Sequence, residues 1–292
     1  MPRRAPAVER SLAVLNFLAA HPDERFTLSE LARNLELNKA TLHAILSALA
    51  DSGYLVRDEE EKSYGLGPAL IAVGNAAVSA FPVVDYAVPE MQALTDDLGL
   101  MCVASAAIHD EIVILARTGS PRPFGVYVQP GQRLPLVPPL GAVFVAWQGP
   151  REIERWLARL GPSAAKQDLE HNRDALVAVK TRGYSVGVEG RGRSDGAPSV
   201  RRGRTLTLEE GVRTIRVEEY APTALDPKAT YRLNHVGAPV FGPDGGVALA
   251  LFLIGFPGPT SGGQVEQLAD RLVSAAARVT KEIQGQPPDG PA

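Results

Sequence analysis

The hydrophobic positions of residues 37–55, LNKATLHAILSALADSGYL, form one stripe on a short predicted helix. At about 100° per residue, four apolar side chains share one face: Leu42, Ile45, Leu46 and Leu49. The other side carries small and hydrogen-bonding residues where an ordinary surface helix has Glu and Lys: Ala40, His43, Ala44 and Ser47, flanked by Lys39 and Thr41. This composition raises the question of what the polar face contacts.

Two further helices precede this one. Apolar residues at helical spacing predict the first over about 8–20: Val8, Leu12, Leu15 and Ala19. The second begins at Thr27, which forms a capping-box pattern with Glu30. Asn38 is the expected N-cap of the third helix, and Gly53 its C-terminal signal. The short gap between the second and third helices is typical of a helix-turn-helix.

Residues 54–67, YLVRDEEEKSYGLG, predict two strands around an acidic turn, with Tyr54 and Val56 facing Tyr64 and Leu66. Three helices followed by a hairpin are the outline of a winged helix-turn-helix. The alternative is a helical bundle whose third helix merely has a small-residue face. The hairpin placed directly after the third helix favours the winged helix-turn-helix.

The rest of the chain mixes helices with hairpins. An alanine-rich helix over 68–80 is apolar nearly all round and is expected to link domains and pack against a second copy. Further helices are expected over 83–98, 141–148, 151–160, 168–182 and 264–283. Hairpins are expected to join 101–108 to 112–117 and 236–241 to 247–254. Hairpin-connected strands with helices beside them predict an α+β domain.

Length and charge narrow the function classes. The 292 residues suffice for two domains, and the net charge of -3 gives no global signal for nucleic acid. Residues 1–67 hold eight basic and ten acidic residues, so DNA binding must depend on positioned groups. The single cysteine, Cys102, excludes an intrachain disulfide and a multi-cysteine metal site.

The start of the chain has the outline of a signal peptide, because Arg3 and Arg4 precede the apolar stretch SLAVLNFLAA. Glu9 and Asn16 interrupt that stretch, and no run approaches a membrane span. We therefore expect a cytoplasmic protein without membrane contact.

Several sequence blocks together resemble the IclR-type transcriptional regulators. They are AVERSLAVLNFLAAHP, TLSELARNLELNKATLHAILSALADSGYLVRDEEEKSYGLGPALIAVG, GQRLPLVPPLGAVFVA, TRGYSVGVEG and LNHVGAPVFGPDGGVALALFLIGFP. The resemblance implies a winged helix-turn-helix DNA-binding domain (1–67), a linker helix (68–82) and a GAF/profilin-like effector-binding domain with an antiparallel sheet (83–284). Residues 285–292 are expected to be a disordered tail. The resemblance also implies a homodimer or dimer of dimers that binds a pseudo-palindromic operator, more often as a repressor, under control of a small-molecule effector.

The chain departs from the family pattern in its sensor domain. Gly141-Ala142-Val143 replaces a usual Gly-Lys-Ala, Gly187 stands where an acidic residue is frequent, and His235 stands where cysteine is frequent. Phe252 and Ile254 replace small hydroxyl residues. An arginine-rich insertion of about thirty residues lies within roughly 190–230.

The candidate DNA contacts combine groups for phosphates, bases and close approach. They are Arg10, Thr27, Ser29, Lys39, Ala40, Thr41, His43, Ala44, Ser47, Arg57 and Lys62. The wing is the predicted hairpin over residues 54–67. Because Asp58 to Glu61 make its turn acidic, we expect the wing to lie beside the DNA backbone and not deep in the minor groove.

The effector lining carried over from the family is mainly apolar: Val126, Leu134, Leu140, Leu233, His235, Phe252 and Ile254. It predicts a hydrophobic effector that takes one hydrogen bond from His235, since an unpartnered carboxylate there would be costly. The alternative is that Phe252 and Ile254 fill the cavity.

No catalytic residue, metal site or cofactor is expected, because no nucleophile elbow, zinc spacing or phosphate loop occurs in the sequence. Two other classes remain open: a sensor or scaffold module that binds protein through the helical head, and an enzyme.

Overall fold

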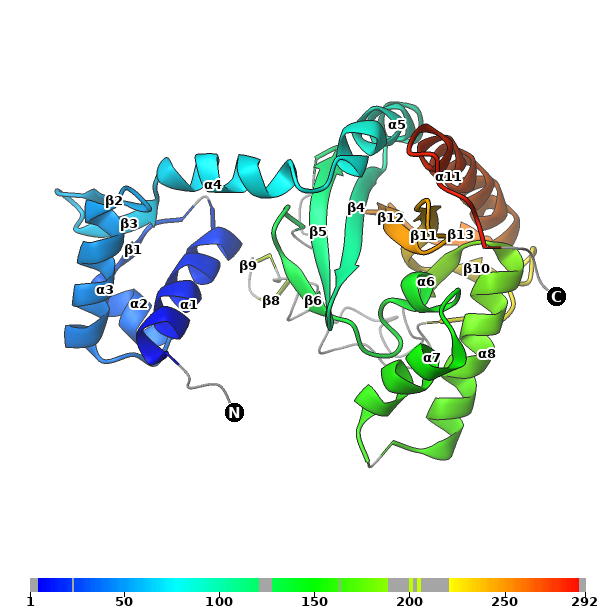
Figure 1. The fold of residues 1–292 in the computed structure, drawn as a ribbon, viewed down its shortest axis with the longest axis horizontal. Coiled ribbons are helices and arrows are strands. Elements are labelled where there is room, and N and C mark those ends of the chain that lie inside the picture. Colours follow the sequence, from blue (N-terminus) through cyan, green and yellow to red (C-terminus); the bar gives the residue numbers. More distant parts are fainter. Residues whose placement is uncertain are drawn as a thin grey trace. The chain divides into compact units, whose positions relative to one another are not determined.

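The computed structural model describes residues 5–22, 24–120, 128–162, 164–188, 200–201, 204–205 and 221–288. The chain divides into two compact units, Met1–Phe81 and Pro82–Ala292. Figure 1 shows the elements of both units. Most of the arginine-rich insertion lies outside the described residues.

The N-terminal unit is a winged helix-turn-helix followed by one more helix. Its elements are α1 (Pro6–Ala20), β1 (Phe26–Thr27), α2 (Leu28–Asn34), α3 (Lys39–Asp51), β2 (Leu55–Asp58), β3 (Ser63–Leu66) and α4 (Ala69–Val78). The three strands form an antiparallel sheet in the order β1-β3-β2. The predicted helices, hairpin and helix-turn-helix are confirmed.

Local signals set the ends of these helices. The Thr27–Glu30 capping box opens α2, and the Asn38 side chain accepts a hydrogen bond from the Ala40 backbone N–H at 2.8 Å to open α3. Gly53 follows α3 with a φ of 74°, a left-handed conformation that favours glycine. These three predictions are confirmed.

The core of this unit differs from the predicted patterns at two places. On α1 the buried residues are Val14 and Leu18, whereas Val8 and Leu12 are exposed, so this helix has a second, uncovered apolar side. The predicted wing register is wrong: Leu55 pairs with Leu66, and Arg57 pairs with Tyr64. Leu55 and Tyr64 are buried in the core, which fixes this register.

The C-terminal unit is built on a six-stranded antiparallel sheet in the order β6-β5-β4-β12-β11-β7. Its strands are β4 (Met101–Ile108), β5 (Glu111–Thr118), β6 (Arg133–Pro135), β7 (Ser185–Val188), β11 (Leu233–Phe241) and β12 (Val247–Ile254). Both predicted hairpins are confirmed, while β6 and β7 were not predicted. Among the described residues, two pairs of short strands lie outside this sheet: β8 (Val200–Arg201) with β9 (Arg204–Thr205), and β10 (Thr230–Tyr231) with β13 (Thr260–Ser261).

Helices cover both faces of this sheet (Figure 1). One face packs against α5 (Val83–Leu98) and α11 (Gly262–Glu282). The other meets α6 (Ala142–Val145), which packs with α7 (Pro150–Leu157) and α8 (Lys166–Arg182). A short 3-10 helix, Ala158–Leu160, continues α7. The fold is therefore α+β, as predicted, although α6 is shorter than the expected 141–148.

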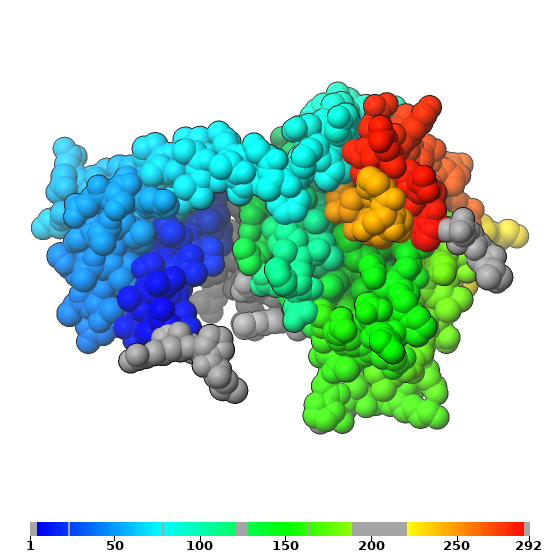
Figure 2. All heavy atoms as spheres, viewed as in Figure 1, coloured from blue at the N-terminus to red at the C-terminus, as the bar shows by residue number. Residues whose placement is uncertain are grey.

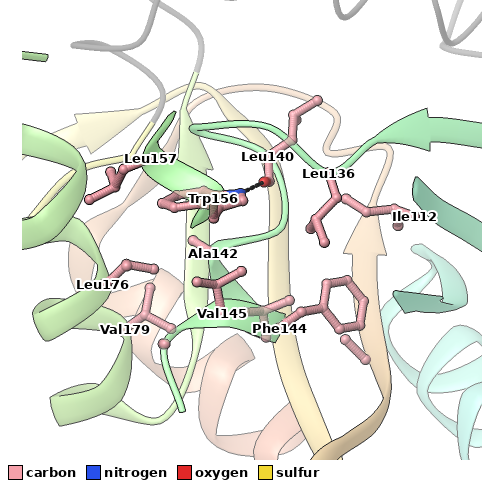
Figure 3. Close-up of a cluster of buried hydrophobic side chains, with 13 residues drawn as sticks. Ile112, Leu136, Leu140, Ala142, Phe144, Val145, Trp156, Leu157, Leu176 and Val179 are labelled. Atoms are coloured by element: carbon pink, nitrogen blue, oxygen red, sulfur yellow. Dashed lines mark hydrogen bonds between the residues drawn. The ribbon is translucent and has the colours of Figure 1, made fainter. Parts of the chain in front are cut away.

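A hydrophobic cluster anchors α6, α7 and α8 to the sheet (Figure 3). Leu136, Ile112 and Phe144 converge on one side of the chain segment that leads into α6. On the other side Trp156 is buried, and its ring N–H donates a hydrogen bond to the Leu140 carbonyl at 3.1 Å. Gly141 lets the chain pass close to Leu136, because a Cβ at this position would lie 2.2 Å from a Leu136 methyl carbon.

The C-terminal helix is followed by ordered backbone contacts. The backbone N–H of Gly285 donates to the Thr280 carbonyl, and that of Gln286 donates to the Gly242 carbonyl. These residues belong to the segment 285–292 that we expected to be a disordered tail. Residues 289–292 lie outside the described residues.

Candidate functional site

The polar side of α3 faces solvent, whereas its apolar side is buried. Leu42 and Leu46 are fully buried in the core of the N-terminal unit, together with Ile45. The candidate DNA contacts on the other side are exposed or half-buried: Lys39, Ala40, Thr41, His43, Ala44 and Ser47. The helix therefore presents a continuous surface of small and hydrogen-bonding groups.

Two candidate contacts from different helices meet at one end of this surface. The Lys39 ammonium donates a hydrogen bond to the Ser29 hydroxyl at 3.0 Å. Both residues are exposed, so the ammonium group and the hydroxyl are available to the same phosphate. The fold brings these two predicted residues together.

Thr27 is held in its helix cap. Its backbone N–H and its hydroxyl both donate to the Glu30 carboxylate, at 2.8 and 2.9 Å. Hydrogen bonds from Thr27, the backbone one first, lower the pKa of Glu30, so the carboxylate stays charged at the start of α2. The capping role is confirmed, while contact with phosphate stays a prediction.

The wing carries its own charge pairs. Arg57 lies 3.6 Å from Glu59 and 6.0 Å from the centre of the Tyr64 ring. Asp58 accepts hydrogen bonds from two backbone N–H groups of the turn, which lower the pKa of its carboxyl. Arg10 and Lys62, the remaining candidate DNA contacts, are exposed. The acidic turn is confirmed as part of an exposed hairpin.

Sequence reasoning missed Arg25. Its guanidinium lies 3.9 Å from the Asp58 carboxylate and its side chain runs over Gly65 of the wing. The pairing of β1 with β3, through Phe26 and Tyr64, places it there. A two-residue strand has no recognisable pattern, so this contact had no signal in the sequence.

In the sensor unit, three predicted effector residues lie side by side on the α6 face of the sheet. His235 pairs with Ile254, and Gly237 pairs with Phe252 on the neighbouring strand. The Phe252 ring lies over Gly237, where a Cβ would come within 2.6 Å of it. The Phe252 and His235 rings meet edge-on, 5.4 Å apart.

The other predicted lining residues are more dispersed. Leu134 and Leu140 belong to the hydrophobic cluster of α6, against which Phe252 also packs. Leu233 lies two residues before His235, where β11 pairs with Val188. Val126 lies outside the described residues. The structure thus groups His235, Phe252 and Ile254 most closely.

This sheet face carries polar groups that sequence reasoning missed. Arg117 pairs with Val103, the neighbour of Phe252, and donates a hydrogen bond to the Val128 carbonyl at 3.1 Å. Ser185 is buried, with its hydroxyl 3.4 Å from His235 Nε2. The buried Ser105 hydroxyl has no hydrogen-bond partner among the described residues. The expectation of nearly all-apolar walls therefore needs correction.

Two titratable side chains of the sheet are kept neutral by their surroundings. Burial, with a smaller effect of the Arg182 charge, lowers the pKa of His235 to about 4, so its imidazole is uncharged at neutral pH. Burial raises the pKa of the Cys102 thiol to about 12. Cys102 is therefore a core residue and not a reactive thiol.

The described residues also bear on metal binding and on membrane insertion. No group of His, Cys, Asp and Glu within the described part of the chain has the arrangement of a metal site. Among those same residues, no helix has both the length and the apolar character that crossing a membrane requires.

An exposed recognition helix in a winged helix-turn-helix, joined to a sensor-like α+β unit, defines a DNA-binding transcriptional regulator with an effector-binding domain. Residues 7–59 match the family model of the IclR helix-turn-helix domain. This match identifies the N-terminal unit as an IclR helix-turn-helix domain, and over its whole length the chain resembles the IclR-type transcriptional regulators.

Named relatives agree with this class. The DNA-binding transcriptional repressor YiaJ of Escherichia coli is 27% identical over 53% of this chain and 55% of its own length. An IclR regulator of Alicyclobacillus acidocaldarius shares the fold, with a TM-score of 0.63 and 22% identity over 96% of this chain and all of the other. An IclR homologue of Microbacterium hydrocarbonoxydans, solved with 4-hydroxybenzoate, has a TM-score of 0.61 and 18% identity, covering 95% of this chain and 98% of the other.

Proposed function

We propose that this chain is a repressor that binds a pseudo-palindromic operator as a homodimer or dimer of dimers, and that an effector with a mainly apolar body controls it. The observation that carries the proposal is the exposed small and polar face of α3, whose apolar side forms the core. The similarity to the repressor YiaJ supports the direction of regulation.

The residues of α3 divide the recognition work. Lys39, at the helix start, binds a phosphate together with Ser29. Thr41 and His43 read base edges, and Ala40 and Ala44 allow the helix to lie deep in the major groove, where they touch thymine methyl groups. Further contacts with the DNA backbone come from Ser47 and from three residues outside α3: Arg10, Arg57 and Lys62.

The exposed apolar residues of α4 support the dimer. Ile71 is 65% exposed and Val73 is 50% exposed, on a helix whose cyan surface is visible in Figure 2. Two residues apart, they point to nearly opposite sides of the helix, and large apolar side chains exposed on more than one side favour burial against another protein surface. In a symmetric dimer the two heads would read half-sites separated by whole helical turns.

The α6 face of the sheet supports an effector with an apolar body. Met101, Val103 and Ile114 form a cluster there, against which Phe252 and Ile254 pack while staying half-buried. Buried hydrocarbon contributes about 25 cal/mol per Å² of apolar area. An aromatic ring suits such walls, and the homologue solved with 4-hydroxybenzoate supports this class.

The α6 face of the sheet also offers hydrogen-bonding and charged groups to the polar ends of an effector. His235 offers one hydrogen bond as a neutral imidazole, and Arg117 offers a cation to a carboxylate. Arg117 and His235 lie three strands apart, and His235 is two residues along β11 from the position in register with Arg117, so their backbones are about 16 Å apart. The competing possibility, that Phe252 and Ile254 fill the site, predicts no effector binding.

The proposal is tested with DNA from upstream of the protein's own gene. We expect sequence-specific retardation in a gel, weakened by salt and relieved by a hydrophobic or aromatic effector.

Calorimetry with panels of hydrophobic and small-acid metabolites tests the effector class. Tight binding of a short dicarboxylate or keto acid, unchanged in His235→Gln, would contradict the hydrophobic effector. Absence of any specific retardation would favour the sensor or scaffold class, and turnover of a ligand would favour an enzyme.

A further inference from the structure

A groove of about 450 Å³ lies at the β7 edge of the sensor sheet, within the range of small-molecule sites. One wall is the outer side of α8, and the loop 223–225 and α11 contribute the rest. The lining used below is Asp174, Val177, Thr181, Arg182, Tyr184 and Glu266. None of these residues belongs to the effector face that contains Phe252 and Ile254.

Arg182 is the main cation of the groove. Its Nε donates to the Tyr184 carbonyl at 2.6 Å and its Nη1 donates to the Pro222 carbonyl at 3.1 Å. The guanidinium carbon lies 5.1 Å from the centre of the Tyr184 ring. These contacts fix the guanidinium plane at the groove wall.

This guanidinium lacks a counter-ion in the described structure. Both of its acceptors are neutral carbonyls, no carboxylate among the described residues pairs with it, and its Nη2 has no hydrogen-bond partner there. The Arg182 residue is half-buried, and this burial lowers its pKa. A desolvated cation held by neutral groups favours an anionic ligand.

The neighbouring side chains narrow the class of anion. Burial raises the pKa of Tyr184, so its hydroxyl remains a donor at neutral pH. Val177, which is 64% exposed, gives the groove an apolar wall together with Ala178 and Leu225. Asp174 and Glu266 also line the groove, and their carboxylates repel anions, so a ligand with one negative charge placed on Arg182 is favoured over a ligand with two.

We propose that this groove is a second ligand site, which binds a monocarboxylate with a short hydrocarbon tail. The carboxylate would lie on Arg182, with the tail along Val177 and Leu225. Such a site would let the protein respond to a metabolite that does not enter the effector face.

The test is calorimetric titration of the full chain with 4-methylpentanoate, methylsuccinate and isohexylamine. We expect 4-methylpentanoate to bind with one site per chain, and at least tenfold more tightly than either the dianion or the amine. Arg182→Gln should abolish this binding. Because Arg182 also holds backbone carbonyls, that variant is checked for folding by circular dichroism.

The second variant, Val177→Asp, changes the groove without disturbing the fold, because the Val177 side chain is exposed. It adds a carboxylate to the groove and should weaken 4-methylpentanoate binding at least tenfold. Gln167→Asp adds the same charge to an exposed position of α8 outside the groove, and should bind like the original chain. Unchanged affinity in Val177→Asp, loss of affinity in His235→Gln instead, or no binding by the original chain would overturn the proposal.

Discussion

The Lys39 ammonium group donates a hydrogen bond to the Ser29 hydroxyl at 3.0 Å, and so joins the first turns of α3 and α2. Because a helix start exposes backbone N–H groups, an anion placed there meets the ammonium, the hydroxyl and partial positive charge together. This relationship makes Lys39 the best-defined candidate for a phosphate contact in the N-terminal unit.

Lys39→Ala should weaken binding to specific and non-specific DNA alike. Each lost phosphate contact should lower the slope of log affinity against log salt by about 0.9. Fluorescence anisotropy over a series of salt concentrations measures the slope. Lys180→Ala, which removes an exposed lysine from α8, is the matched control. An unchanged slope in Lys39→Ala would exclude the contact.

Thr27→Ala should lower the free energy of unfolding of the N-terminal unit by about 1 kcal/mol, because the capping box of α2 is lost. Urea denaturation followed by circular dichroism measures this change. Ser29→Ala, in the first turn of the same helix, removes no cap and should leave the midpoint near that of the original chain. Equal losses in both variants would show that the cap adds little.

Loss of stability on acidification should depend on His235. Its folded pKa of about 4 lies below the ordinary 6.5, so between these values only the unfolded chain binds the proton. The free energy of unfolding should therefore fall as the pH drops from 6.5 to 4, by up to about 3 kcal/mol.

The variant His235→Gln should flatten this dependence, as measured by urea denaturation at several pH values. Ser185→Ala keeps the imidazole and should keep most of the slope. If His235→Gln retained the full slope, another group would be responsible for it.

Gly237→Ala should disturb the effector face directly. The added methyl group would lie 2.6 Å from the Phe252 ring and 2.7 Å from the Ser185 hydroxyl, so the ring must move. We expect a loss of about 1–3 kcal/mol in the free energy of unfolding. The double variant with Phe252→Leu should recover part of it. Additive losses in the double variant would show that the methyl group does not act through Phe252.

The boundaries of the recognition helix could be predicted because its signals are local. Asn38 caps the first turn, Gly53 takes a left-handed conformation, and the apolar spacing between them has a helical period. The exposed face of α3 could therefore be assigned from the sequence. The register of the wing could not be predicted. Its two strands have only four residues each, and both of their faces carry apolar residues, so only the burial of Leu55 in the core decides which face points inward.

The polar residues on the α6 face of the sheet, Arg117 and Ser185, could not be predicted for a different reason. A bulge in β5 leaves Leu115 unpaired, so Ile114 and Arg117 face the same side although they are three residues apart. Simple alternation would have put them on opposite faces. The four residues of β7, which bring Ser185 beside His235, are too few to show a strand period.

We infer that the exposed face of α3 reads DNA. The most direct test is the affinity of Ala44→Glu for the operator, measured by anisotropy alongside its free energy of unfolding. Ala44 is exposed, so the added carboxylate should leave folding unchanged while phosphates and base acceptors repel it. We predict loss of specific binding in Ala44→Glu and normal binding in Gln167→Glu, which adds the same charge to α8. Full operator affinity in a folded Ala44→Glu protein would show that this face of α3 does not contact the operator.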